Sequence, residues 1–136
     1  MSKIDDLVKG RLEINYYHLR DLNDRDTMIF LVREAIQNNI RYCAFQGDDD
    51  FFIPTSLSKC ATFLSENPDY RTAQGRAAVI VMDKPECFAN IKWMGEYWGE
   101  NSLEDSSKVG RLLSFDKNRY VMMFSTHRIK EYIADS

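Results

Sequence analysis

The sequence has 136 residues, a formal net charge of −3 and a hydrophobic content of 44%. A chain of this length fits a single domain, and one this apolar is not expected to be disordered. The slightly acidic balance gives no general attraction for nucleic acid or anionic lipid, so neither is expected as a partner.

The first part of the chain alternates helix and strand patterns. A helix is expected over residues 2–9, and residues 12–16 alternate apolar and polar side chains like a half-buried strand. An apolar stripe then predicts a second helix, for which Asp24 or Asp26 is a suitable N-cap. Residues 40–45 are rich in side chains that fit a pleated strand.

The second part of the chain predicts another helix beginning at Pro54, which suits the first helical turn. Residues 77–82 form a continuous apolar run typical of a buried strand, whereas residues 87–101 show no clear periodicity. Helices are expected over residues 103–115 and 129–134. The apolar positions of the Pro54 helix recur at helical spacing: Leu57, Cys60, Ala61 and Leu64.

The order of these elements predicts the fold class. A strand at 12–16, a helix and a strand at 40–45 form a βαβ unit, whose two strands are expected to be parallel neighbours. We therefore predict an α/β fold of three layers, with a mostly parallel sheet and flanking helices, in one domain spanning residues 1–136.

The three cysteines, Cys43, Cys60 and Cys87, are odd in number and show no C-x-x-C spacing. They are expected to be free thiols, with Cys43 and Cys60 buried, as suits a reducing cytoplasm. No apolar run approaches the roughly 20 residues of a membrane span, and the first ten residues do not resemble a signal peptide. We therefore expect a cytoplasmic protein.

Three consecutive carboxylates, Asp48, Asp49 and Asp50, stand between the 40–45 strand and the helix that begins at Pro54. Ligands of open α/β sheets bind at such strand ends. Two unit charges about 5 Å apart repel by roughly 3 kcal/mol at an effective dielectric near 20, and a bound Mg²⁺ or Mn²⁺ removes that repulsion. The alternative is a solvated acidic turn that complements the positive N-terminal dipole of the following helix.

Residues 47–77, GDDDFFIPTSLSKCATFLSENPDYRTAQGRA, resemble the metal-binding segment of GT-A-fold glycosyltransferases of the inverting, family-two type. In that family an acidic pair closes a strand, and a proline four residues past its last aspartate opens a helix. Asp50, Pro54 and Leu57 keep this spacing, and the later part of the segment is similar to a smaller bacterial and phage branch. One departure is Gly47, where relatives often carry an acid.

The resemblance implies a metal-dependent glycosyltransferase, or a catalytic-domain fragment of one. Such an enzyme moves a sugar from a nucleoside-diphosphate donor to a hydroxyl group of a glycan or small-molecule acceptor. It implies Mn²⁺ or Mg²⁺ bound by the three aspartates, and Asp105 as candidate catalytic base. The candidate substrate-binding residues are Arg76, Trp93, His127 and Arg128.

Each of these residues has an ordinary structural explanation that the sequence leaves open. Asp105 fits the acidic start of a helix, and Arg76 fits an exposed surface arginine. His127 fits a structural histidine, and Trp93 fits a core aromatic residue.

The resemblance also implies a partial domain. The strand–helix–strand unit that holds the nucleotide base in such enzymes is expected upstream of Met1, and the usual position of the base falls after Ser136. A missing leading unit leaves an open sheet edge, which predicts a homo-oligomer. The alternative function is a non-catalytic α/β assembly or binding module derived from the same fold.

Overall fold

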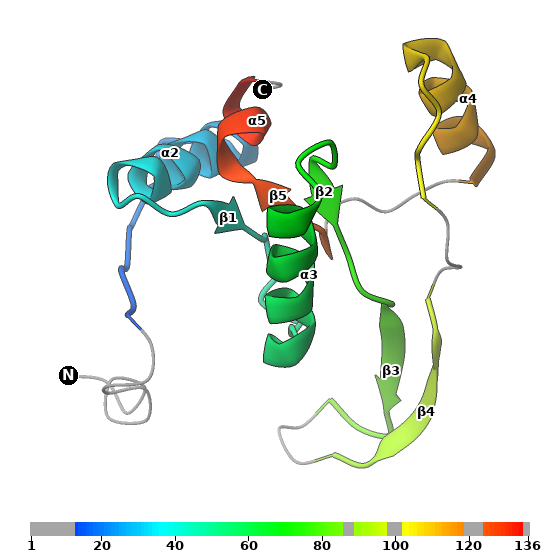
Figure 1. Ribbon diagram of the computed structural model, residues 1–136. Coiled ribbons are helices and arrows are strands. Elements are labelled where there is room, and N and C mark those ends of the chain that lie inside the picture. Colours follow the sequence, from blue (N-terminus) through cyan, green and yellow to red (C-terminus); the bar gives the residue numbers. More distant parts are fainter. Residues whose placement is uncertain (1–12, 86–88, 98–101, 119–123, 135–136) are drawn as a thin grey trace.

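The computed structural model describes residues 13–85, 89–97, 102–118 and 124–134, and Figure 1 shows their arrangement. The helix expected over residues 2–9 and the third cysteine, Cys87, lie outside the described residues. The elements are α2 (Asp24–Gln37), β1 (Tyr42–Cys43), α3 (Pro54–Glu66), β2 (Thr72–Ala73), β3 (Ala78–Met82), β4 (Ile91–Glu96), α4 (Lys108–Asn118), β5 (Thr126–Arg128) and α5 (Ile129–Ala134).

The N-cap of helix α2 is Asn23, in place of Asp24 or Asp26, which the sequence suggested. The side chain of Asn23 accepts a hydrogen bond from the backbone N–H of Asp26 at 2.9 Å. Asp24 and Asp26 lie in the first turn, where their charge complements the positive end of the helix dipole. The helix ends at Gln37 with Asn38 as its C-cap, and Asn39 adopts a positive φ of 59°, a conformation that asparagine tolerates better than most residues.

Helix α3 begins at Pro54, as the sequence predicts, and buries Cys60 and Leu64. Its C-terminal end is closed by Asn67, whose backbone N–H and side-chain amide both donate to the carbonyl of Phe63, at 2.9 and 2.8 Å. The 3.6-residue spacing of the apolar positions therefore correctly predicts which face is buried.

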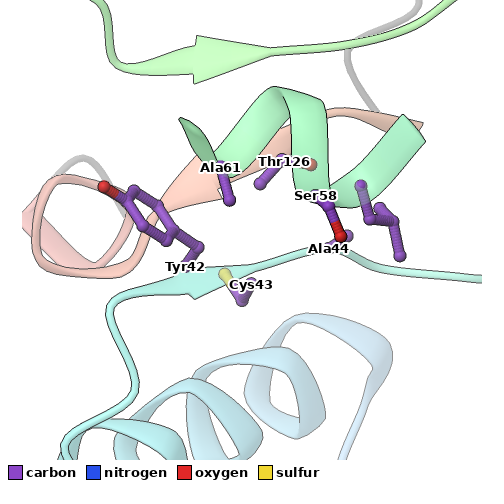
Figure 2. Close-up of a pocket in the computed structure, with 7 residues that line it drawn as sticks. Tyr42, Cys43, Ala44, Ser58, Ala61 and Thr126 are labelled. Carbon is purple, nitrogen blue, oxygen red and sulfur yellow. The ribbon is translucent and has the colours of Figure 1, made fainter. Parts of the chain in front are cut away.

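The three-stranded sheet has the order β1–β5–β2, and β5 is antiparallel to both neighbours. Its register pairs Tyr42 with Arg128 and Cys43 with His127 on one side, and Thr72 with His127 on the other. Because both outer strands oppose β5, β1 and β2 run in the same direction and are joined through α3. Figures 1 and 2 show β1 lying between α3 and α2.

These pairings correct the expected sheet. The α/β class holds, but every strand pair among the described residues is antiparallel, in place of a mostly parallel sheet. Residues 13–19 have no regular secondary structure, so the described chain contains no strand at 13–16 to pair with β1. Tyr17 in this segment packs against α2, where its ring meets Phe30 at 5.1 Å and its hydroxyl donates to Glu34 at 3.1 Å. Side-chain contacts with the helix thus replace strand pairing.

Strands β3 and β4 form a separate antiparallel ribbon. Its register pairs Ala78 with Glu96 and Val81 with Trp93, and a bulge follows Val81. The apolar run at 77–82 is a strand, as predicted, but it is not buried: Val81 and Met82 are each 42% exposed. Only one strand partners it in the described chain, and the side chains of the ribbon are exposed on both faces, with Trp93 at 55% and Met94 at 63%.

The core is small. The buried apolar side chains among the described residues come from helices on both sides of β5: Val32, Cys60, Leu64 and Ile129. Leu64 of α3 and Ile129 of α5 are almost completely inaccessible, at 0% and 1%. α5 also contacts α2, which brings Val32 into the same region. The sheet and the three helices α2, α3 and α5 therefore form one packed body.

Arg128 at the end of β5 binds the C-terminal end of α3 and the turn that follows it. Its Nη2 donates to the carbonyls of Leu64 and, at 3.2 Å, Asn67, and its Nε donates to the carbonyl of Tyr70 at 2.7 Å. The last carbonyls of a helix have no intrahelical partner, and a cation at this end also complements the helix dipole. Arg128 therefore fixes α3 on the sheet.

Replacing Arg128 by lysine should lower the free energy of unfolding by about 2–3 kcal/mol, because lysine keeps the charge but lacks the planar fork that meets several carbonyls at once. Urea denaturation measures this loss. Arg33→Lys, on the exposed part of α2, is the matched control and should change stability by no more than about 0.5 kcal/mol. Equal stability of Arg128→Lys and the wild type would contradict the capping role.

Candidate functional site

The acidic turn lies between β1 and α3. All three aspartates are exposed, and the turn is held by a backbone bond from Asp50 to Gly47 at 3.4 Å and by the side-chain amide of Gln46, which donates to the carbonyl of Asp50 at 2.8 Å. A β-carbon placed at Gly47 would lie 3.0 Å from Oδ1 of Asp49 and 3.0 Å from Oδ2 of Asp50. The carboxylates of Asp49 and Asp50 thus converge on the same point, above the glycine.

The donor atoms of this turn suit a hard cation. Two carboxylates on one side are the usual protein contribution to a Mg²⁺ or Mn²⁺ site, which water and substrate phosphates complete. Within the described ranges, no group of three or more His, Cys, Asp or Glu side chains is placed to surround an ion. Asp49 and Asp50 together are therefore the part of the expected metal site that the structure brings together.

Gly75 lies close to the start of α3. Its backbone approaches Ser56 so closely that a β-carbon would collide with the serine hydroxyl. Glycine leaves room for the serine hydroxyl in its present position, and Arg76 follows directly in the chain. Arg76 forms an exposed ion pair with Glu96 of β4 at 3.9 Å, with the arginine side chain 67% exposed.

A shallow pocket of about 280 Å³ lies between β1, α3 and β5, and Figure 2 shows the residues around it. This volume is at the lower end of the roughly 300–1,000 Å³ of small-molecule sites. The pocket is mainly apolar, with a few hydroxyl and thiol groups, and it does not include the acidic turn. Its lining consists of Tyr42, Cys43, Ala44, Leu57, Ser58, Ala61 and Thr126.

Burial changes the acidity of the thiols at this junction. It raises the pKa of Cys43 above its ordinary value, so the thiol form is favoured at neutral pH. Burial also raises the pKa of Cys60, and a hydrogen bond with Thr126 opposes that change. Both cysteines are free, and a protonated thiol is a poor nucleophile. The two side chains act here as small apolar groups.

The structure places His127 and Arg128 in β5, inside the packed body. His127 lies among aromatic rings, 5.2 Å from Tyr132 and 6.3 Å from Phe45 between centroids. Arg128 donates to the backbone carbonyls at the end of α3, and its guanidinium lies 6.0 Å from the ring of Tyr42. Both side chains thus have structural contacts where they lie.

Asp105 precedes α4 and organises its first turn. Its carboxylate accepts hydrogen bonds from the backbone N–H and the hydroxyl of Ser107, each at 2.8 Å, and these bonds lower its pKa. The Ser107 hydroxyl in turn accepts from the backbone N–H of Gly110 at 2.9 Å. Gly110 lies so close to the Asp105 carboxylate that a side chain there would collide with it. Asp105 therefore stabilises the start of α4.

The candidate residues do not form one cluster in the described chain. The acidic turn lies directly before α3, whereas Arg76 pairs with Glu96 of β4. Trp93 lies on the ribbon, 55% exposed, and Asp105 lies just before α4. The pocket residues were missed from the sequence. Thr126 and Ser58 could not have been selected, because nothing in the chain order indicates that β5 inserts between β1 and β2.

Three comparisons with known proteins, against family models, curated proteins and solved structures, found no match to this chain. None of the helices in the described ranges is long and apolar enough to cross a membrane. The interpretation of the site therefore depends on its geometry and on the sequence resemblance.

One hydrogen bond predicts a pH dependence of stability. The Tyr70 hydroxyl donates to Glu104 at 2.7 Å, and this bond, followed by one from Ser102, lowers the pKa of Glu104 below its ordinary value of 4.5. A carboxyl whose pKa is lower in the folded state stabilises the fold above its unfolded pKa, and this contribution disappears as pH falls through the folded value.

Tyr70→Phe should therefore be less stable than the wild type near neutral pH, and the difference should shrink below about pH 4 as Glu104 becomes protonated. Urea denaturation over a pH series measures this change. Tyr16→Phe removes the hydroxyl of a tyrosine that is 84% exposed and should show no such profile. A Tyr70→Phe difference that is the same at all pH values would contradict the assignment.

Proposed function

We propose that this chain is a metal-dependent glycosyltransferase, or a catalytic-domain fragment of one, that moves a sugar from a nucleoside-diphosphate donor to a hydroxyl acceptor. The observation that supports this most directly is the convergence of Asp49 and Asp50 above Gly47, at the junction of β1 and α3. The spacing of Asp50, Pro54 and Leu57, which resembles the GT-A metal-binding segment, supports the same function.

In this proposal Asp49 and Asp50 hold a Mn²⁺ or Mg²⁺ ion, with Asp48 beside them. When bound, such an ion acts as a Lewis acid and neutralises charge on a departing diphosphate. Arg76 follows Gly75, which lies against Ser56 of α3, and is the candidate positive charge for a phosphate oxygen. The acceptor hydroxyl needs a general base, and Asp105 is the candidate.

The proposal extends to the fold, the partners and the compartment. In the antiparallel sheet, β1 and β2 lie on either side of β5, run in the same direction and are joined by α3, and we propose that this arrangement is part of a GT-A-like sheet. The donor is a nucleotide sugar and the acceptor a glycan or small molecule. Of the three candidate binding residues, Trp93 is exposed and suits contact with a sugar, whereas His127 and Arg128 have structural contacts within the body. We also propose that the chain is a homo-oligomer and that it is located in the cytoplasm. The free thiols of Cys43 and Cys60 support the cytoplasmic location.

A second candidate function is a non-catalytic α/β assembly module. Large apolar side chains are exposed on α4, where Leu112 is 66% and Leu113 65% exposed, as well as on the β3–β4 ribbon. The hydrogen bonds of Arg128 and Asp105 are structural in this case, and the acidic turn is only a solvated turn. Exposed apolar surface of this extent is typical of protein–protein contact.

Thermal denaturation with uridine, guanosine, adenosine and cytidine diphosphates, each with and without Mn²⁺, distinguishes the two functions. The transferase predicts that one diphosphate together with Mn²⁺ stabilises the chain, by about 2.7 kcal/mol when the ligand is at 100 times its Kd. Asp49→Asn and Asp50→Asn should each abolish this effect, because each removes one ion ligand.

Asp21→Asn is the matched control, an exposed aspartate that precedes α2, and it should keep the full response. Stabilisation that requires Mn²⁺ and both aspartates supports the transferase. No Mn²⁺-dependent stabilisation by any of the four diphosphates, with a normally folded chain, would contradict it and leave the assembly module.

A further inference from the structure

The β3–β4 ribbon exposes apolar side chains on both faces. On one face Val81 is paired with Trp93, and on the other Ile80 is paired with Met94; Trp93 and Met94 are 55% and 63% exposed. An isolated two-stranded ribbon is marginally stable in water and needs further strands or a covering layer. Figure 1 shows the ribbon extending away from the β1–β5–β2 sheet.

The outer edge of β4 is open to a further strand in the described chain. The ribbon contains β3 and β4 alone, and the backbone N–H of Tyr97 donates to the carbonyl of Ala77 across it at 2.8 Å. Because backbone groups alternate in direction along an antiparallel strand, the N–H and C=O groups of Glu96 and Met94 point away from β3. These groups are the ones that a neighbouring strand would bind.

The sequence of β4 is complementary to itself in one antiparallel register. When two copies pair about a two-fold axis at Met94, Lys92 of each lies opposite Glu96 of the other, so two pairs of opposite charge form. In this register the outward-facing backbone N–H and C=O groups of Met94 lie opposite the C=O and N–H groups of Met94 in the other copy, as in a hydrogen-bonded pair. In the same register Trp93 lies opposite Gly95 of the other copy. The indole of Trp93 lies over Gly95 of its own chain, so the two indoles are neighbours across the axis.

We propose that this chain forms a two-fold symmetric dimer in which two β4 edges pair antiparallel about Met94 and join the two ribbons into a four-stranded sheet. An isologous contact of this kind uses the same surface on both copies and closes after two subunits. The intramolecular ion pair between Glu96 and Arg76 is exposed at 3.9 Å, and such surface pairs contribute little, so it does not prevent pairing with Lys92 of a second copy.

The accessible surface supports a second copy as the occupant. The chain has a mass of 15.9 kDa and an accessible surface of 11658 Å². A compact monomer of this mass exposes roughly 7,400 Å². The excess of about 4,000 Å² per chain is more than the roughly 1,000–2,500 Å² that each subunit of an obligate dimer buries, so the chain exposes enough surface for such a contact.

Charge exchange tests the register. Lys92→Glu places glutamates opposite each other twice per dimer, so sedimentation velocity should show the dimer weakened about tenfold or more. Glu96→Lys should weaken it in the same way by opposing lysines. The double variant Lys92→Glu with Glu96→Lys restores both opposite-charge pairs and should return the Kd to within about threefold of the wild type. Lys59→Glu on the exposed side of α3 is the matched control and should leave the dimer unchanged.

Disulfide trapping tests the position of the axis. A hydrogen-bonded antiparallel pair has Cα atoms about 5.5 Å apart, within the range of roughly 4.4–6.8 Å that disulfides span. Met94→Cys should therefore form a covalent dimer under mild oxidation. Met82→Cys, equally on the ribbon but on β3, should form no more than the parent chain with its three native cysteines.

Rescue by the double charge exchange together with trapping at position 94 supports the proposal. A chain that is monomeric at all concentrations overturns it. The proposal is also overturned if Lys92→Glu leaves the dimer intact, or if the double variant fails to restore it. It is overturned as well if Met94→Cys forms no more covalent dimer than Met82→Cys. None of these results depends on nucleotide or metal binding, so they stand apart from the test of the transferase.

Discussion

The packed body of this protein depends on the guanidinium of Arg128 binding the C-terminal end of α3. One side chain supplies hydrogen bonds to the carbonyls of Leu64, Asn67 and Tyr70, which lie 58 to 64 residues earlier in the chain. Without it, the end of the helix would present unpaired carbonyls and the negative end of its dipole to the interior. Leu64, whose carbonyl accepts one of these bonds, and Ile129, which follows Arg128, are the two most buried side chains of the body.

The rest of the chain is attached to this body by a few polar contacts. α4 follows a segment tied by the bond between Tyr70 and Glu104, and β4 is linked to the segment after β2 through Glu96 and Arg76. The expected site residues are likewise divided between the packed body and the elements attached to it. The acidic turn is positioned by β1 and α3 in the body, whereas Trp93 and Asp105 are on the attached elements. Bringing all of them around one substrate requires those elements to be fixed by further contacts, which a second copy would provide for the ribbon.

The features that were predicted correctly from the sequence are those that depend on residues close together in the chain. Pro54 and the apolar spacing after it correctly located α3 and its buried face, and α5 begins at residue 129 as expected. The sheet could not be obtained in this way, because β5 is three residues long, polar in composition and placed between β1 and β2 only by long-range pairing. The role of Arg128 was missed for the same reason, since its partners are backbone carbonyls. For the site, the sequence identified the acidic turn, but the pocket beside it required Thr126 from β5.

A stable body organised by Arg128 and Leu64 carries a ribbon that is not stable by itself. Native-state hydrogen exchange, measured amide by amide at low and high protein concentration, distinguishes the stability of these two parts. Amides around Leu64 and Ile129 should exchange only through global unfolding at both concentrations. Amides of β3 and β4 should exchange much faster in dilute solution and become protected as concentration rises. Ribbon amides as slow as those of α3 in dilute solution, or α3 amides that exchange before the ribbon, would contradict the account.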